Sequence, residues 1–171
     1  MSKTGALQEL ITAIDLCFEK RLITPTLALL YSGIDTMAWL GIPDNQGEVT
    51  RKDFIQWVGR YLLPDSGIPC SALDLYSARC GILHSMTGES RATRQGDAKE
   101  IYYAWGNHTA ERLQQFVDLK GQPALVLQVD TLVRAFKSAV DKFVTASEQD
   151  PELNRRVDAR RKKIFTNLQD L

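Results

Sequence analysis

Histidine and cysteine are scarce in this sequence, which limits the chemistry that the protein can perform. The 171 residues include only two histidines, His84 and His108, and three cysteines, Cys17, Cys70 and Cys80. No two cysteines have the Cys-x-x-Cys spacing of a metal or redox motif, and an odd number does not fit a disulfide framework. We therefore expect reduced thiols, no metal site and no cofactor.

Long apolar runs and a net charge are also missing. No stretch approaches the ~20 apolar residues that span a bilayer, and the first residues lack the pattern of a secretory signal. We therefore expect a cytoplasmic protein that does not associate with membranes. The 21 basic and 21 acidic residues balance, which argues against a non-specific DNA-binding protein. This balance still permits a local site for RNA or another anion.

Common catalytic motifs are absent as well. The sequence contains no Gly-rich phosphate loop, no Gly-x-Gly-x-x-Gly, no His-Glu-x-x-His and no Gly-x-Ser-x-Gly. The most familiar nucleotide-binding, zinc-protease and serine-hydrolase classes therefore have no support.

Apolar residues recur at helical spacing through most of the chain, and this pattern predicts a mainly α fold. We expect helices over about residues 5–21, 25–40, 50–63, 71–85 and 130–149, and a charged helix over 151–171. The short link between the first two helices favours an up-and-down helical bundle. Residues 1–147 would form this bundle, and residues 148–171 would pack on it or extend it.

Local signals mark where several of these helices begin. Thr24-Pro25 predicts the start of the second helix, because proline is well tolerated at the first helical position. Thr50, with Asp53 three residues later, predicts a capping box at the third helix. Ser71 is a suitable cap for the fourth helix, with Asp74 in its first turn.

The middle of the chain is less regular. Residues 88–96 are polar and contain glycine, which predicts a loop. The short apolar segments 100–105 and 124–129 are expected to pair as a small antiparallel β-ribbon insertion, with a helix over 109–119 between them.

The strongest chemical signal is an arginine followed five positions later by a histidine, Arg79 and His84, near the end of the fourth helix. RNA carries its own nucleophile, the 2′-hydroxyl, so its cleavage needs proton transfer and stabilisation of the phosphate. Histidine exchanges protons near neutral pH, and arginine can hold two phosphate oxygens with its planar fork.

On an ideal helix Arg79 and His84 point ~140° apart. They would flank an apolar seam formed by Leu73, Tyr76, Cys80 and Leu83. The long arginine side chain, a loosened turn at Gly81 or a symmetric partner helix could bring the groups together.

Residues 76–85, with the sequence YSARCGILHS, resemble the HEPN superfamily helix that carries arginine, four to six residues and then histidine. The segment YSGIDT at residues 31–36 also looks like uncharacterised bacterial proteins of this type, and the helix order is similar over about residues 5–145. The resemblance implies a HEPN-like helical bundle, a homodimer with a composite cleft, and metal-independent endoribonuclease activity, in a toxin–antitoxin or phage-defence setting. Its implied partners are RNA and a protein partner or antitoxin.

Two other interpretations of Arg79 and His84 stay open. Many active members have Asn, Asp or His directly after the arginine, where this chain has Cys80, and this favours a non-catalytic interaction or scaffold module. A third hypothesis is a regulator that binds a small ligand at an anion site on Arg79.

Four further residues are candidates for substrate binding. Asp35 could orient Arg79 or His84, and Ser85 could contact phosphate. Arg91 and Arg94 could guide an RNA strand. Each also has an ordinary structural explanation. Asp35 can be a surface carboxylate and Ser85 a hydroxyl that satisfies the helix end, and the two arginines can be solvated loop charges.

Overall fold

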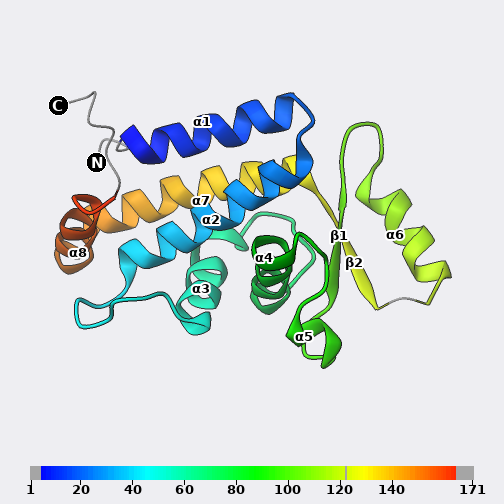
Figure 1. The fold of residues 1–171 in the computed structure, drawn as a ribbon. Coiled ribbons are helices and arrows are strands. Elements are labelled where there is room, and N and C mark those ends of the chain that lie inside the picture. Colours follow the sequence, from blue (N-terminus) through cyan, green and yellow to red (C-terminus); the bar gives the residue numbers. More distant parts are fainter. Residues whose placement is uncertain (1–4, 122, 165–171) are drawn as a thin grey trace.

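The structure is mainly helical, as the sequence predicts (Figure 1). This computed structural model describes residues 5–121 and 123–164. The helices are α1 (Gly5–Glu19), α2 (Ile23–Gly41), α3 (Arg51–Trp57), α4 (Ala72–Ser85), α5 (Arg91–Arg94), α6 (Ala110–Leu119), α7 (Val129–Gln149) and α8 (Pro151–Arg161). A π-helical turn, η1 (Val58–Leu62), continues α3, and β1 (Glu100–Ala104) and β2 (Ala124–Gln128) form a small sheet. No described helix is long and apolar enough to cross a lipid bilayer.

Helix α2 lies at the centre and contacts α1, α3, α4, α7 and α8. Its residues Leu30, Tyr31 and Ile34 are fully buried. Gly33 is needed where α2 meets α7, because a Cβ atom there would lie 2.6 Å from Cζ of Phe136. Most of the apolar core therefore forms around one helix.

The predicted start of α2 is wrong by two residues. The helix begins at Ile23, so Pro25 is its third residue, and Leu22 before it makes no side-chain cap. Proline fits here because the amide groups of the first helical turn have no partner within the helix. Thr24 is therefore inside the helix and does not cap it.

The predicted caps of the third and fourth helices are confirmed. Thr50 and Asp53 form a reciprocal capping box at α3, and Ser71 and Asp74 form one at α4. The second carboxylate oxygen of Asp74 also accepts a hydrogen bond from the Lys99 amide at 2.7 Å. This contact joins the start of α4 to the segment before β1.

The two strands pair in parallel, so the predicted antiparallel ribbon is wrong. Glu100 lies opposite Ala124, and the register continues to Ala104 opposite Gln128. The connection contains α6, which gives the chain the length to cross back and run in the same direction. Gln114 of α6 accepts a hydrogen bond from the Val126 amide at 2.7 Å and donates to the Ala124 carbonyl at 3.1 Å. These bonds satisfy backbone groups of β2 that do not pair with β1.

Two other segments differ in detail from the prediction. The third helix divides into α3 and the π-helical turn η1, and the polar segment 88–96 contains the short helix α5. Ser90 caps α5 by accepting a hydrogen bond from the Thr93 amide. The end of the chain, where Leu168 and Leu171 were expected to continue the last helix, lies outside the described residues.

Helix α8 packs on the ends of α7 and α2 (Figure 1). Leu153 and Val157 are buried in the main core. Arg160 is also buried, and its guanidinium donates to the carbonyl of Ile42, to that of Pro43 at 2.7 Å and to that of Gln46 at 3.3 Å. The charged helix thus fixes the loop that follows α2.

The capping carboxylate of α3 should make stability depend on pH. Partial burial acts to raise the pKa of Asp53, but hydrogen bonds from Thr50 and Gln46 outweigh it and hold that pKa below its ordinary value. A lowered folded-state pKa stabilises the fold above the unfolded-state pKa, and this contribution is lost as pH falls through the folded-state pKa. Asp53→Asn should lower the free energy of unfolding by about 1 kcal/mol at neutral pH.

Urea denaturation at neutral and strongly acidic pH measures this effect. The difference between wild type and Asp53→Asn should vanish in acid, where the wild-type carboxyl is also uncharged. Asp97→Asn is the control, because this exposed carboxylate forms no hydrogen bond or ion pair within the described residues. An equal loss of stability at both pH values would contradict the assignment.

Candidate functional site

Arg79 and His84 lie together on α4. The Nη1 atom of Arg79 is 3.4 Å from Nε2 of His84. The helix is continuous from Ala72 to Ser85, so no loosened turn at Gly81 is involved. The long arginine side chain alone spans the angle that five helical residues impose.

The prediction of an apolar seam between Arg79 and His84 is wrong. The buried face of α4 contains Leu75, Ala78 and Ile82, whereas the four residues of the expected seam are only partly buried: Leu73, Tyr76, Cys80 and Leu83. Apolar residues occur on several sides of this helix, so their spacing does not single out the face that contacts α2 and β1. Arg79 consequently lies beside α2 and is partly buried, and His84 is exposed.

Asp35 of α2 holds the arginine in place. Its Oδ2 atom accepts hydrogen bonds from Arg79 Nε at 2.8 Å and from Nη2 at 2.6 Å. Each of the two side chains is 23% exposed, so the pair lies at the edge of the core. These bonds leave Nη1 directed at His84 and, at 4.0 Å, at the sulfur of Cys80.

The charge of Arg79 is secure in this setting. Partial burial acts to lower the pKa of its guanidinium, but the hydrogen bonds and negative charge of Asp35 outweigh burial and raise that pKa above its ordinary value. Arg79 therefore remains a cation at any physiological pH.

Ser85 is engaged at the end of α4. Its hydroxyl donates to the Gly81 carbonyl at 2.9 Å and lies 2.8 Å from the Thr87 hydroxyl. Such bonds satisfy the last turn of a helix, where carbonyl groups lack helical partners. The structure thus gives Ser85 a structural contact beside His84.

Arg91 and Arg94 lie apart from the pair, on α5. Both side chains are exposed, and neither has a hydrogen bond or ion pair with Arg79 or His84. Arg94 lies 3.9 Å from the Glu89 carboxylate. Arg94, Glu89 and Lys99 together line a pocket that includes neither Arg79 nor His84. Within the described residues, then, the structure brings together Asp35, Arg79 and His84 and leaves the two loop arginines outside.

Gly81 lets the chain fold back against the helix. A Cβ atom at this position would lie 2.5 Å from the Thr87 carbonyl oxygen and 2.8 Å from that of Glu89. The hydroxyl of Ser77, also buried on α4, hydrogen-bonds that of Ser90 just beyond this segment. The Arg-x4-His segment therefore includes a glycine required for packing.

His84 is exposed, whereas Arg79 is partly buried at the edge of the core. Three pockets lie elsewhere in the described residues, and neither Arg79 nor His84 lines any of them. The described residues contain no group of three metal-ligating side chains. The fold also gathers Trp57, Arg60 and Arg156 around one of these pockets, and no local sequence pattern singles these residues out.

Gly81→Ala should lower the free energy of unfolding by about 1–3 kcal/mol, because the added methyl group meets backbone oxygens that cannot rotate away. Thermal or urea denaturation measures the loss. Gly59→Ala is the matched control, since a Cβ atom there meets nothing within 4 Å. Equal stabilities of the two variants would show that residues 87–89 can move freely.

The contact between Asp35 and Arg79 should appear as a coupling energy of about 1 kcal/mol in a double-mutant cycle with Asp35→Ala and Arg79→Ala. The value is modest because both side chains keep some contact with water. Urea denaturation of the four proteins measures it, and purely additive losses would contradict the contact.

Comparisons with protein-family models, with curated proteins and with solved structures give no match to this chain. The likeness of residues 76–85 to the HEPN helix therefore stays a prediction, and any function has to follow from the geometry of the site.

Proposed function

We propose that the Arg79–His84 pair cleaves single-stranded RNA without a metal ion. The observation that supports this proposal is the 3.4 Å approach of a guanidinium to an imidazole on the exposed side of α4. Groups this close can contact one phosphodiester at the same time, one as a cation and the other in proton transfer.

The chemistry follows from these two groups. The 2′-oxygen of RNA attacks the adjacent phosphorus, and the bond from phosphorus to the 5′-oxygen breaks. His84 either accepts the proton of the 2′-hydroxyl or protonates the departing 5′-oxygen, and such acid–base help is typically worth ~100- to 10,000-fold in rate. Arg79 binds the phosphate oxygens as negative charge develops, and Asp35 positions its guanidinium. The products are a 2′,3′-cyclic phosphate and a 5′-hydroxyl.

A homodimer fits the exposed position of His84. A second copy packed beside α4 would form a composite cleft with the first and would supply a second histidine for the other proton transfer. RNA approaching this cleft could pass the exposed Arg91 and Arg94 of α5. The same proposal includes a toxin–antitoxin or defence role, with a protein partner that blocks the cleft.

A non-catalytic interaction module is the second candidate, and a specific observation favours it. Two of the nitrogen atoms of Arg79 already donate to Asp35, which leaves fewer donors for a phosphate. In this alternative, Asp35 and Arg79 join α2 to α4, and His84 stabilises the C-terminal end of α4. Loss of either residue would then change stability or assembly alone.

Cleavage of a fluorescent single-stranded RNA in the presence of EDTA tests the proposal. Wild type should cleave it, and His84→Ala should lower the rate by about 100-fold or more, since proton transfer is lost. His108→Ala is the matched control, because His108 is exposed and is the other histidine of the chain.

Circular dichroism should show that both variants keep the wild-type fold. A folded wild-type protein that leaves the RNA intact would favour the interaction module. Equal loss of cleavage in both histidine variants would remove the special role of His84.

A further inference from the structure

A second cation lies beside the Arg79–His84 pair, where α3 meets α4. Tyr76 lies about one helical turn before Arg79, and the guanidinium carbon of Arg51, the first residue of α3, is 5.7 Å from the centre of the Tyr76 ring. This distance is typical of a cation–π contact. Arg51 is exposed, and among residues 5–121 and 123–164 it forms no ion pair and no side-chain hydrogen bond. Its donors are therefore available to a ligand.

Contacts along α4 connect Arg51 to the proposed site. Tyr76, Cys80 and His84 are each four residues apart, so they follow one face of α4 in a row about 12 Å long. Arg79 leans onto this row, with Nη1 3.4 Å from His84 Nε2 and 4.0 Å from the sulfur of Cys80. Arg51 lies at the Tyr76 end. A single strand that follows the row would pass the Arg79–His84 pair and then Arg51.

The charge at the Tyr76 end of the row is positive. Burial raises the pKa of Tyr76, contact with the Cys80 thiol raises it further, and the positive charges of Arg79 and Arg51 act to lower it. Tyr76 therefore stays neutral and leaves the charge of Arg51 intact. Asp35 offsets the charge of Arg79, whereas no carboxylate in the part of the chain that the structure describes pairs with Arg51.

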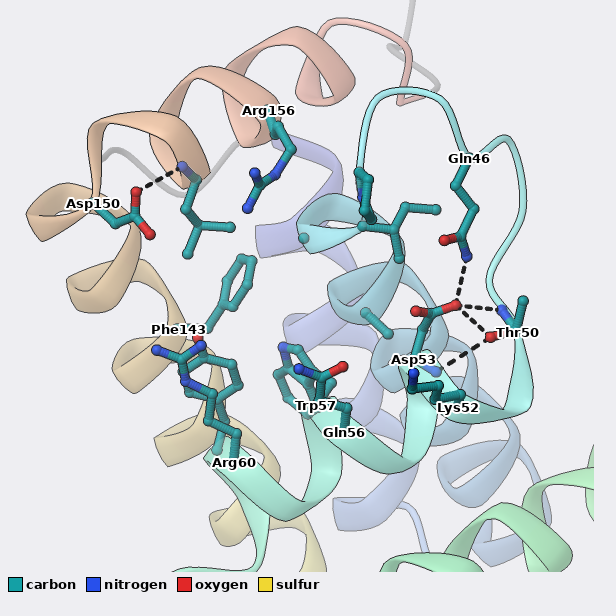
Figure 2. A pocket seen from close by; sticks show the side chains of 16 residues that line it. Gln46, Thr50, Lys52, Asp53, Gln56, Trp57, Arg60, Phe143, Asp150 and Arg156 are labelled. Carbon is teal, nitrogen blue, oxygen red and sulfur yellow. Dashed lines mark hydrogen bonds between the residues drawn. The ribbon is translucent and has the colours of Figure 1, made fainter.

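Both partners of the cation–π contact are fixed before any ligand binds. The ring of Tyr76 meets that of the buried Phe54 edge-on, with centroids 5.5 Å apart. The capping box of Thr50 and Asp53 holds the first turn of α3, and Figure 2 shows its hydrogen bonds at one wall of a pocket. Asp53 lines that pocket and Arg51 does not, so the carboxylate and the guanidinium face different sides of α3. A cation held in advance binds its ligand with less loss of entropy.

We propose that Arg51, positioned by Tyr76, binds the phosphate group next to the one at the Arg79–His84 pair. This inference rests on the proposed action of the pair on RNA. Arginine can bind phosphate oxygens through its N–H groups while its flat face stays on an aromatic ring. Proteins that bind single strands commonly combine cations along the backbone with aromatic side chains. The preferred substrate is therefore a strand with at least two consecutive phosphodiester groups.

Cleavage of two short RNAs tests this inference. A dinucleotide without terminal phosphates has one phosphodiester group, and a trinucleotide has two. Arg51→Gln should lower kcat/KM for the trinucleotide by about tenfold, because a charge-assisted hydrogen bond to the second phosphate is lost. The same variant should cleave the dinucleotide at the wild-type rate, since that substrate does not reach Arg51. A loss caused by a weakened fold would affect both substrates equally and would contradict the inference.

Arg60→Gln is the matched control. Arg60 is also an exposed arginine over a tyrosine, with its guanidinium carbon 5.2 Å from the centre of the Tyr61 ring. The control therefore removes the same charge and the same type of contact. Arg60 lies in η1, beside Phe143 at the pocket in Figure 2, and not at the start of α3. Arg60→Gln should cleave both RNAs like wild type.

Binding of an uncleavable 2′-deoxy strand, measured by fluorescence anisotropy at several salt concentrations, separates this inference from the proposed cleavage. Arg51→Gln should weaken binding by about tenfold and reduce the slope of log K against log salt by about 0.7, the value for one lost phosphate contact on a single strand. Arg60→Gln should change neither quantity.

Unchanged binding and unchanged trinucleotide cleavage in Arg51→Gln would overturn the inference and leave the proposed cleavage intact. Binding that depends on Arg51, in a wild-type protein that cleaves no RNA, would support the phosphate contact and remove the proposed cleavage alone. A wild-type protein that binds no single strand would overturn both.

Discussion

The burial of α2 on nearly all sides is the constraint on which the rest of the fold depends. Five helices contact it, and Gly33 lets α7 approach closely enough for Phe136 to pack against its backbone. A helix enclosed in this way has few places for a charged group. Asp35 lies at one of them, at the edge of the core, and there it binds Arg79 of α4.

This ion pair connects the core to the proposed chemistry. Because Asp35 fixes Nε and Nη2 of Arg79, the remaining nitrogen is directed at His84. Gly81 of α4 lets residues 87–89 fold back closely over this helix. The segment between Arg79 and His84 therefore has a packing role as well.

Local patterns predicted much of the fold. Helical spacing located the helices, and the caps of α3 and α4 were readable because capping boxes involve residues three apart. Strand direction was not readable, since it depends on how the chain crosses over through α6. The buried face of α4 was also missed, because apolar residues surround that helix and its neighbours decide which of them are covered.

The candidate site was partly predictable, because part of it is a local sequence pattern. Arg79 and His84 stand out as a short motif, and Asp35 was one named candidate for orienting them, although 44 residues separate Asp35 from Arg79. The helical angle alone placed the arginine and histidine apart, and only the side-chain conformation brings them together. The pocket around Trp57 had no sequence signal, since Arg156 reaches it from a distant helix.

The most direct test of the central claim compares a single-stranded RNA with its 2′-deoxy copy, both incubated with wild-type protein and EDTA. If Arg79 and His84 act on a phosphodiester attacked by its own 2′-hydroxyl, the RNA is cut to 2′,3′-cyclic phosphate ends and the deoxy copy stays intact. Intact RNA, or equal cleavage of both strands, would contradict this account.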